Sequence, residues 1–432
     1  MLKKTLIPDL LAGLTVSFAA ISLGAAFGTL SGRGAFAGML AAAVIPIVSS
    51  VFGGTRLQAS GPTAPMTAVS ALVIAFAYEN FNDSKILAEQ FVTLVFLLTG
   101  ALLMIAGITR LGKFIVLVPQ VIILGFMNGI ALLIWVDQFI KLFGFGAGKN
   151  PLQGNLVTNV TIAFSTLLLI YLIPWLLKKA NVPEKIRAFM PSILLTIIIM
   201  TTITVGLNIN VEKVQLGNTI DSSSEYFSLL VNYFPSSEIF TFDLFLLALP
   251  YALQLTLLCY LDSLLTSLVI DKMTMEKTKQ NKELIAQGLA NGMAGLFQCI
   301  PGAQATIRSV LLLKEGAKSR LAGVFVGAFV ILGIVIFKDY ITLIASAVFV
   351  GVLFKAGLDV FDRDFIINYY KRNWLRSKTR NIQFGFILYT TFVTVLFDLN
   401  IAVVSGTILF FIAEKFTNIQ DAEADFSKVN VK

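Results

Sequence analysis

Two charged residues stand inside apolar runs of this 432-residue sequence, Asp262 and Arg308. Asp262 lies in YLDSLLTSLVID (260–271), where Thr266 follows four residues later and shares one face of a helix with it. A carboxylate and a threonine hydroxyl are hard oxygen ligands, which suit a sodium ion or a proton better than a soft metal. Asp262 is the only carboxylate deep inside a predicted span, so we interpret it as a cation ligand or, alternatively, as the structural counter-ion of Arg308.

Arg308 follows a broken segment, CIPGAQAT (299–306), and a second segment of this kind is GGTRLQASGPTAPMTAVS (53–70). Both pass from Gly- and Pro-rich backbone directly into a short apolar helix. The first amides of such a helix lack intrahelical partners and carry partial positive charge, so two facing ends attract an anion. The alternative for either motif alone is a simple kink in helix packing. The predicted anion ligands are Thr63, Ala64, Ala305, Thr306 and the amide of Ile307, with the full charge supplied by Arg308.

Several kinds of chemistry are disfavoured by composition. The sequence has no histidine and two cysteines, Cys259 and Cys299, each inside an apolar run. A transition-metal site, a disulfide framework and a neutral-pH histidine relay therefore lack their usual residues. No nucleophile elbow or nucleotide-binding motif is present either, so we expect no enzyme, no cofactor and no nucleic-acid partner.

The elements that must position these residues are transmembrane helices. With 56% hydrophobic and 13% charged residues and a mean hydropathy of +0.83, the chain is predicted to be an all-α integral membrane protein. We predict about fourteen spans, several of them too short to cross alone. They are 9–30, 35–53, 61–79, 91–109, 114–143, 157–177, 189–208, 243–270, 283–298, 303–313, 321–337, 340–356, 384–397 and 399–414.

The basic residues predict the orientation, because Lys and Arg are retained in the cytosol. Of the 33 Lys and Arg residues, the predicted external segments carry only Arg33, Lys85, Lys141, Lys149, Lys213 and Lys338. Both termini are therefore predicted to be cytosolic, in a multi-pass protein of the plasma (inner) membrane. The basic and aromatic run 369–380 is a candidate contact for anionic lipid, or simply reflects this topology.

The spans divide into two halves at the long external loop 209–242. Residues 1–208 form a first repeat of seven spans, 243–416 form a second, and 417–432 form a cytosolic tail. Because seven is odd, the two halves must have opposite orientations, which makes an inverted repeat. The broken segment is third in each half, so we predict that two half-helices meet at mid-membrane.

Five stretches, in this order, resemble the SulP family of inorganic anion transporters, most closely its BicA-type sodium-dependent bicarbonate transporters. They are GGTRLQASGPTAPMTAV, LDSLLTSLVID, NKELIAQGLANGMAGLF, PGAQAT and VGVLFKAGLDV. The resemblance covers essentially the whole chain. It implies a uracil-permease-like fold of seven plus seven spans, divided into core and gate domains, with elevator-like alternating access and the possibility of a homodimer.

The resemblance also assigns residues. It implies that Thr63 and Ala64 contact bicarbonate, that Ala305 and Thr306 face it, and that Phe27 in LGAAFG lines the anion site. It implies a sodium ion held by Asp262, Thr266, Gln304, Ala305 and Thr306.

The sequence departs from the family pattern in two ways. It ends without the STAS domain that usually follows, and it has Arg308 where BicA-type proteins can have a small residue. A fixed charge also suits sulfate, chloride or a dicarboxylate. Sodium-coupled bicarbonate uptake is thus the leading prediction, and the alternatives are a proton-coupled sulfate or dicarboxylate symporter, a chloride/bicarbonate exchanger and an anion channel.

Overall fold

The computed structural model describes residues 2–417 apart from several short gaps. These are 83, 145–151, 184–186, 188–191, 215–222, 237–238, 240, 364, 366, 368, 370–376 and 398. The predicted tail beyond 417 and the centre of the basic run 369–380 lie outside the described residues.

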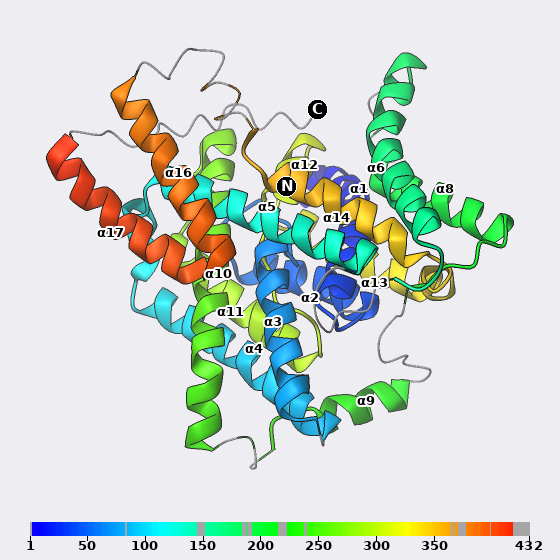
Figure 1. The fold of residues 1–432 in the computed structure, drawn as a ribbon, viewed down its shortest axis with the longest axis horizontal. Helices are drawn as coiled ribbons and strands as arrows, with labels where there is room; N and C mark the ends of the chain where they lie inside the picture. The colour runs from blue at the N-terminus through cyan, green and yellow to red at the C-terminus, as the bar shows by residue number, and fades with distance from the viewer. Residues whose placement is uncertain are drawn as a thin grey trace. The chain divides into compact units, whose positions relative to one another are not determined.

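The described chain is helical almost throughout, and its helices follow the predicted order (Figure 1). The first half holds α1 (Leu2–Leu30), α2 (Ala35–Phe52), α3 (Ala64–Asn80), α4 (Lys85–Ile108), α5 (Gln120–Phe143), α6 (Leu156–Lys179) and α8 (Ser192–Gly206). The second half holds α10 (Phe242–Thr274), α11 (Gln280–Leu296), α12 (Thr306–Lys314), α13 (Leu321–Ile341), α14 (Ser346–Val360), α16 (Lys378–Leu396) and α17 (Leu399–Thr417). Each predicted span overlaps one of these helices, which confirms the arrangement of seven plus seven.

Membrane insertion explains why the chain is helical, because a helix satisfies all its backbone hydrogen bonds within one segment. Six described helices are long and apolar enough to cross a bilayer. They are Thr5–Leu30, Ala35–Phe52, Lys85–Ile108, Gln120–Phe143, Leu156–Lys179 and Phe242–Leu268. Shorter apolar helices occur at Leu195–Gly206, Leu321–Ile336 and Ser346–Lys355.

The two broken segments pair with each other through a pair of two-residue strands. Strand β1 (Ser60–Gly61) lies antiparallel to β2 (Ala303–Gln304), with Ser60 opposite Gln304 and Gly61 opposite Ala303. Gly302 allows this approach, since a Cβ there would lie 2.3 Å from the carbonyl group of Gly61. Each strand leads within two residues into its half-helix, α3 or α12, so the two helices start next to the same backbone crossing.

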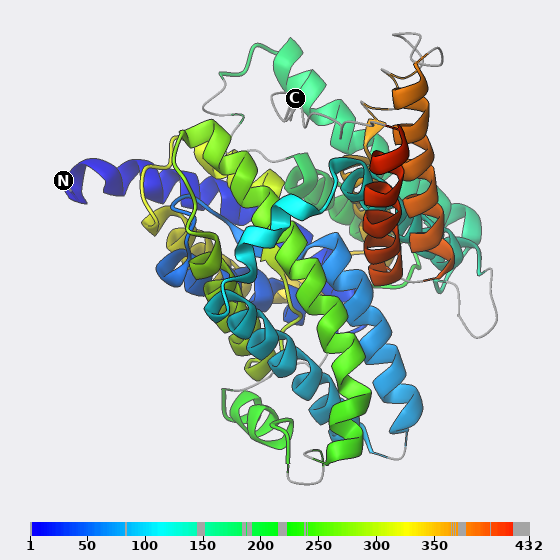
Figure 2. The same ribbon diagram turned by 90° about the vertical axis from the view of Figure 1, so that its left-hand side faces the viewer.

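Helix α10 is the main neighbour of this crossing. It packs against α3, α4, α11 and α12 and against β2. Figures 1 and 2 show α10 as a long helix running beside α3 and α4. One face of α10 can therefore contact both broken segments.

The chain forms two compact units. The first comprises 1–112 and 152–352, and the second comprises 113–151 and 353–432. Both broken segments and α10 belong to the first unit.

Two elements differ from their predicted form. The predicted span 114–143 is a 3-10 helix (Leu111–Leu117) followed by α5, because Pro119 lacks an N–H and restricts the residue before it. The predicted external loop 209–242 contains a helix, α9 (Ser223–Asn232).

Three further carboxylates are buried in helices, each at or just before the first residue of a predicted span, so the depth of Asp262 in the membrane stays a prediction. Asp9, Glu89 and Glu283 all lie in helices with 0–4% exposure. Each one has buried donors: Glu89, for example, pairs with Arg33 at 2.5 Å and accepts from the Tyr78 hydroxyl at 2.6 Å. Helix α4 begins at Lys85, six residues before the predicted span, and this earlier start brings Glu89 into the helix.

Candidate functional site

Both half-helices begin without a side-chain cap. Thr63 is the N-cap residue of α3, yet its hydroxyl makes no capping bond, and the N-cap residue of α12 is Ala305, which has no polar side chain. A threonine at this position normally accepts from an amide of the first turn. The first amides of α3 and α12 are thus left uncapped by these side chains, which is the arrangement that binds anions at helix N-termini.

Arg308 brings a buried positive charge to the same place. Its side chain is 2% exposed and donates from Nη2 to the Pro62 carbonyl oxygen at 2.8 Å, while Nη1 has no hydrogen-bond partner. The guanidinium packs against Gly61, whose φ of +147° and lack of a Cβ make room for it. No carboxylate among the described residues pairs with Arg308, so the reading of Asp262 as its salt-bridge partner is wrong. A buried charge with an unpaired N–H is expensive unless an anion completes its bonding.

Oxygen atoms gather where α10 meets the two broken segments. Thr63 Oγ1 donates to Asp262 Oδ2 at 2.9 Å. One turn later, Thr266 Oγ1 donates to the Gln304 carbonyl oxygen at 3.1 Å and lies 2.6 Å from Thr306 Oγ1. These contacts form two hydrogen-bonded groups one helical turn apart on α10, which together hold a carboxylate, three hydroxyls and a carbonyl oxygen. We call these residues the oxygen cluster, and hard oxygen donors of this kind fit a sodium ion.

Accessibility differs within this cluster. Thr63, Asp262, Ala305 and Thr306 are partly exposed, whereas Thr266 is 2% exposed. The first four residues therefore keep some accessible surface, whereas Thr266 is enclosed by its neighbours.

Two of the predicted site residues, Phe27 and Ile307, are not among the hydrogen-bonded residues of the oxygen cluster. Phe27 is 5% exposed on α1, a helix that packs against both α3 and α12. The Ile307 side chain is 43% exposed, and its amide stays a predicted anion ligand.

Several residues that hold the crossing in place were not identified from the sequence. Ser263 Oγ accepts from the Gln304 amide at 3.2 Å, and Asn291 bonds both the amide and the carbonyl of Gly302, at 2.8 and 2.9 Å. Gln287 donates to Ser60 Oγ at 2.8 Å and to Glu283 at 2.9 Å. Polar side chains recur every four residues on α11, at Glu283, Gln287 and Asn291, and therefore share one face of the helix. This spacing is the sequence pattern from which their role could have been predicted.

Glu283 anchors the backbone that leads into β1. Its carboxylate accepts from the amides of Gly54 and Thr55, both at 2.8 Å, and from Gln58 Nε2 at 3.2 Å. With 0% exposure and four donors, it is fully occupied by the loop. We therefore infer that Glu283 positions the broken segment and does not bind a transported ion.

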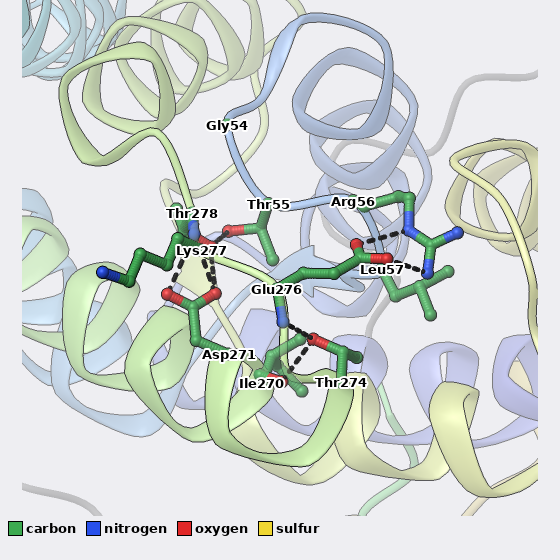
Figure 3. Close-up of a pocket in the computed structure, with 10 residues that line it drawn as sticks. All are labelled: Gly54, Thr55, Arg56, Leu57, Ile270, Asp271, Thr274, Glu276, Lys277 and Thr278. Atoms are coloured by element: carbon green, nitrogen blue, oxygen red, sulfur yellow. Dashed lines mark hydrogen bonds and ion pairs between the residues drawn. The ribbon is translucent and has the colours of Figure 1, made fainter.

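A small polar pocket lies beside this loop (Figure 3). Its volume is about 40 Å³, and it is lined by 54–57 and the end of α10. Asp271 accepts from the amide of Thr278 at 2.9 Å and from its hydroxyl at 2.7 Å, and the same hydroxyl lies 3.1 Å from Thr55 Oγ1. Thr55 in turn donates to Gln304 Oε1 at 3.4 Å, so a line of polar groups connects the pocket to the oxygen cluster.

Known proteins with similar sequences are membrane transporters. Residues 6–375 match the model described as the sulfate permease family. The bicarbonate transporter BicA of Picosynechococcus sp. is 30% identical over 427 residues, covering 95% of this chain and 71% of that protein. The putative sulfate transporter YvdB of Bacillus subtilis is also 30% identical, over 417 residues, covering 94% and 72%.

A solved structure shows the same fold. The transmembrane domain of a cyanobacterial bicarbonate transporter BicA superimposes with a TM-score of 0.77 at 29% identity, covering 93% of this chain and 97% of that one.

Proposed function

This chain belongs to the sulfate permease family of anion transporters, and we propose that it moves bicarbonate inward together with sodium as a secondary active transporter. Family membership makes it a transporter and not an enzyme. The single observation that carries the anion site is Arg308, buried with an unpaired Nη1 beside two uncapped helix N-termini.

The site residues are assigned as follows. The amides that begin α3 and α12, the hydroxyls of Thr63 and Thr306 and the charge of Arg308 hold the anion. Asp262, Thr266, Thr306 and the Gln304 carbonyl hold sodium, with Ala305 between the two ions and Phe27 beside the anion. Sodium would neutralise Asp262 while the anion neutralises Arg308, so the loaded site is close to neutral.

This charge balance gives a physical reason for co-transport. A site carrying only one of the two ions retains an uncompensated charge, and moving that charge through a low-dielectric environment is costly. An elevator-like mechanism is part of the proposal, and it agrees with the division of the chain in that every residue assigned to the site lies in the first compact unit.

The cellular setting follows from the charge pattern and the family. We place the protein in the plasma membrane as a homodimer in contact with lipid, with both termini in the cytosol. The basic residues on the predicted cytosolic side support this orientation.

A sulfate or dicarboxylate symporter driven by protons is the second candidate. Arg308 favours it, because a fixed charge suits a divalent anion, and one relative is named as a putative sulfate transporter. In that case Asp262 would carry a proton in place of sodium.

Uptake into proteoliposomes tests the proposal. Purified protein is reconstituted, and uptake of radiolabelled bicarbonate and sulfate is measured in sodium and in choline medium at constant pH. We expect bicarbonate uptake that requires sodium. Robust uptake in sodium-free medium would exclude sodium coupling, and a preference for sulfate would select the second candidate.

A further inference from the structure

One face of α10 contacts the N-cap residue of α3 and the first residue of α12. Asp262 accepts from Thr63 Oγ1, at the start of α3, and Thr266 Oγ1 lies 2.6 Å from Thr306 Oγ1, at the start of α12. Asp262 and Thr266 are one helical turn apart, so the two contacts lie side by side. The predicted anion-binding hydroxyls are therefore bonded to the predicted cation ligands.

A threonine hydroxyl has a single hydrogen to donate. Thr63 gives its hydrogen to Asp262, and its oxygen does not cap α3. Thr266 Oγ1 lies 3.1 Å from the Gln304 carbonyl oxygen and 2.6 Å from Thr306 Oγ1, and either hydroxyl can be the donor in the second contact. When Thr266 donates to the carbonyl, Thr306 must supply the hydrogen in its contact with Thr266. With these bonds made, neither hydroxyl can also donate to an anion.

We propose that the hydroxyls of Thr63 and Thr306 couple the two ions by changing the direction in which they donate. This inference rests on the proposed function. A cation occupies the lone pairs of Asp262 and Thr266 that receive these hydrogens, and a hydroxyl bound to a cation through its oxygen must point its hydrogen away. Both hydrogens then turn toward the anion, so each ion strengthens binding of the other.

The coupling is reciprocal, because the factor by which sodium raises anion affinity must equal the factor by which the anion raises sodium affinity. Typical coupling factors lie between about 5 and 150. Thr63 is the best residue for a test of coupling, because its hydroxyl connects the two ion sites but is not one of the assigned sodium ligands.

The test measures anion affinity in two media. Isothermal titration calorimetry with the purified full chain gives the bicarbonate Kd in saturating sodium gluconate and in choline gluconate, and the ratio of the two values is the coupling factor. The variants are Thr63→Val, which removes the hydroxyl, and Thr63→Ser, which retains it. Thr99→Val is the matched control, because Thr99 is a buried threonine whose hydroxyl donates to its own helix at Val95.

We expect the parent, Thr63→Ser and Thr99→Val to share one coupling factor, and Thr63→Val to bind the anion weakly with a factor near one. If Thr63→Val weakens binding equally in both media, or not at all, Thr63 is not the coupling element and the inference fails while sodium coupling stands. A parent protein with no sodium effect on Kd would overturn both the inference and the proposed function.

If Thr63→Val does not fold, Thr306→Val provides the second measurement. Its anion Kd at saturating sodium should approach its Kd in choline. An unchanged parental ratio in this variant would likewise refute the inference.

Discussion

At the scale of single residues, the site depends on two opposite charges that do not pair with each other. Among the described residues, Arg308 donates only to the Pro62 carbonyl, and Asp262 accepts from Thr63. Two uncapped helix ends contribute together only about one positive charge, so Arg308 adds a comparable amount. Each charge is thus available to an ion of opposite sign.

We predict that Arg308→Ala weakens anion binding about ten- to a hundredfold, as expected for loss of a charged hydrogen bond worth about 1.5–3 kcal/mol. The range of transported anions should also narrow, with monovalent anions retained and divalent anions lost. Competition by unlabelled anions against labelled bicarbonate measures both effects. Arg56→Ala is the control, because Arg56 pairs with Glu276 at an exposed site; equal transport of every anion by Arg308→Ala would make Arg308 purely structural.

Asp262→Asn should abolish sodium-stimulated uptake while the protein still folds, because an amide cannot compensate a cation. Thr266→Val should raise the sodium concentration needed for half-maximal uptake. Both predictions are tested by measuring uptake into proteoliposomes as a function of sodium concentration. Thermal unfolding of each variant shows whether it is folded. Sodium stimulation that survives in Asp262→Asn would move the cation site elsewhere.

At the scale of elements, the backbone crossing of β1 and β2 determines where both half-helices start. It depends on close approach at Gly302 and on the polar stripe of α11, where Asn291 holds Gly302 and Glu283 holds the loop before β1. These bonds fix backbone groups that have no partners in a helix. The helix ends are therefore preorganised for a ligand.

Gly302→Ala should separate the strands, because its Cβ would lie 2.3 Å from Gly61. We expect lower thermal stability, by about 1–3 kcal/mol as for overpacking in a core, together with loss of transport. Gly292→Ala is a matched control on α11, where an added Cβ meets nothing within 4 Å. Similar melting temperatures for the two variants would show that the crossing tolerates a side chain.

At the scale of the whole molecule, orientation in the membrane is set by charge. The native cysteines, Cys259 and Cys299, are both 0% exposed, so the chain has little background for thiol labelling. Cysteines introduced on either side can therefore report the topology directly.

Lys213→Cys should react with a membrane-impermeant maleimide added to intact cells, because Lys213 lies in the predicted external loop. Lys277→Cys, in the predicted cytosolic segment after α10, should react only after permeabilisation. Gel-shift labelling measures both. The reverse pattern would contradict the predicted orientation.

The hydropathy, the span count and the order of the broken segments follow from local sequence. An apolar run of sufficient length must become a helix in lipid, and Pro62 and Pro301 lie in the breaks before α3 and α12, where their missing N–H groups disfavour a continuous helix. The sequence alone therefore determined the repeat of seven plus seven spans and identified Asp262, Thr266, Thr63 and Arg308 as candidates for chemistry.

Only the tertiary structure decided which residues are the hydrogen-bond and ion-pair partners of the buried polar side chains. Periodicity places Asp262 and Thr266 on one face of a helix but does not say which residues that face meets, and the structure brings Thr63 to Asp262 rather than Arg308. The burial of Glu89 and Glu283 likewise depends on contacts with Arg33 and with the Gly54 and Thr55 amides, which are distant in sequence. Hydrogen bonds between such residues depend on how the helices pack, and no local pattern encodes that packing.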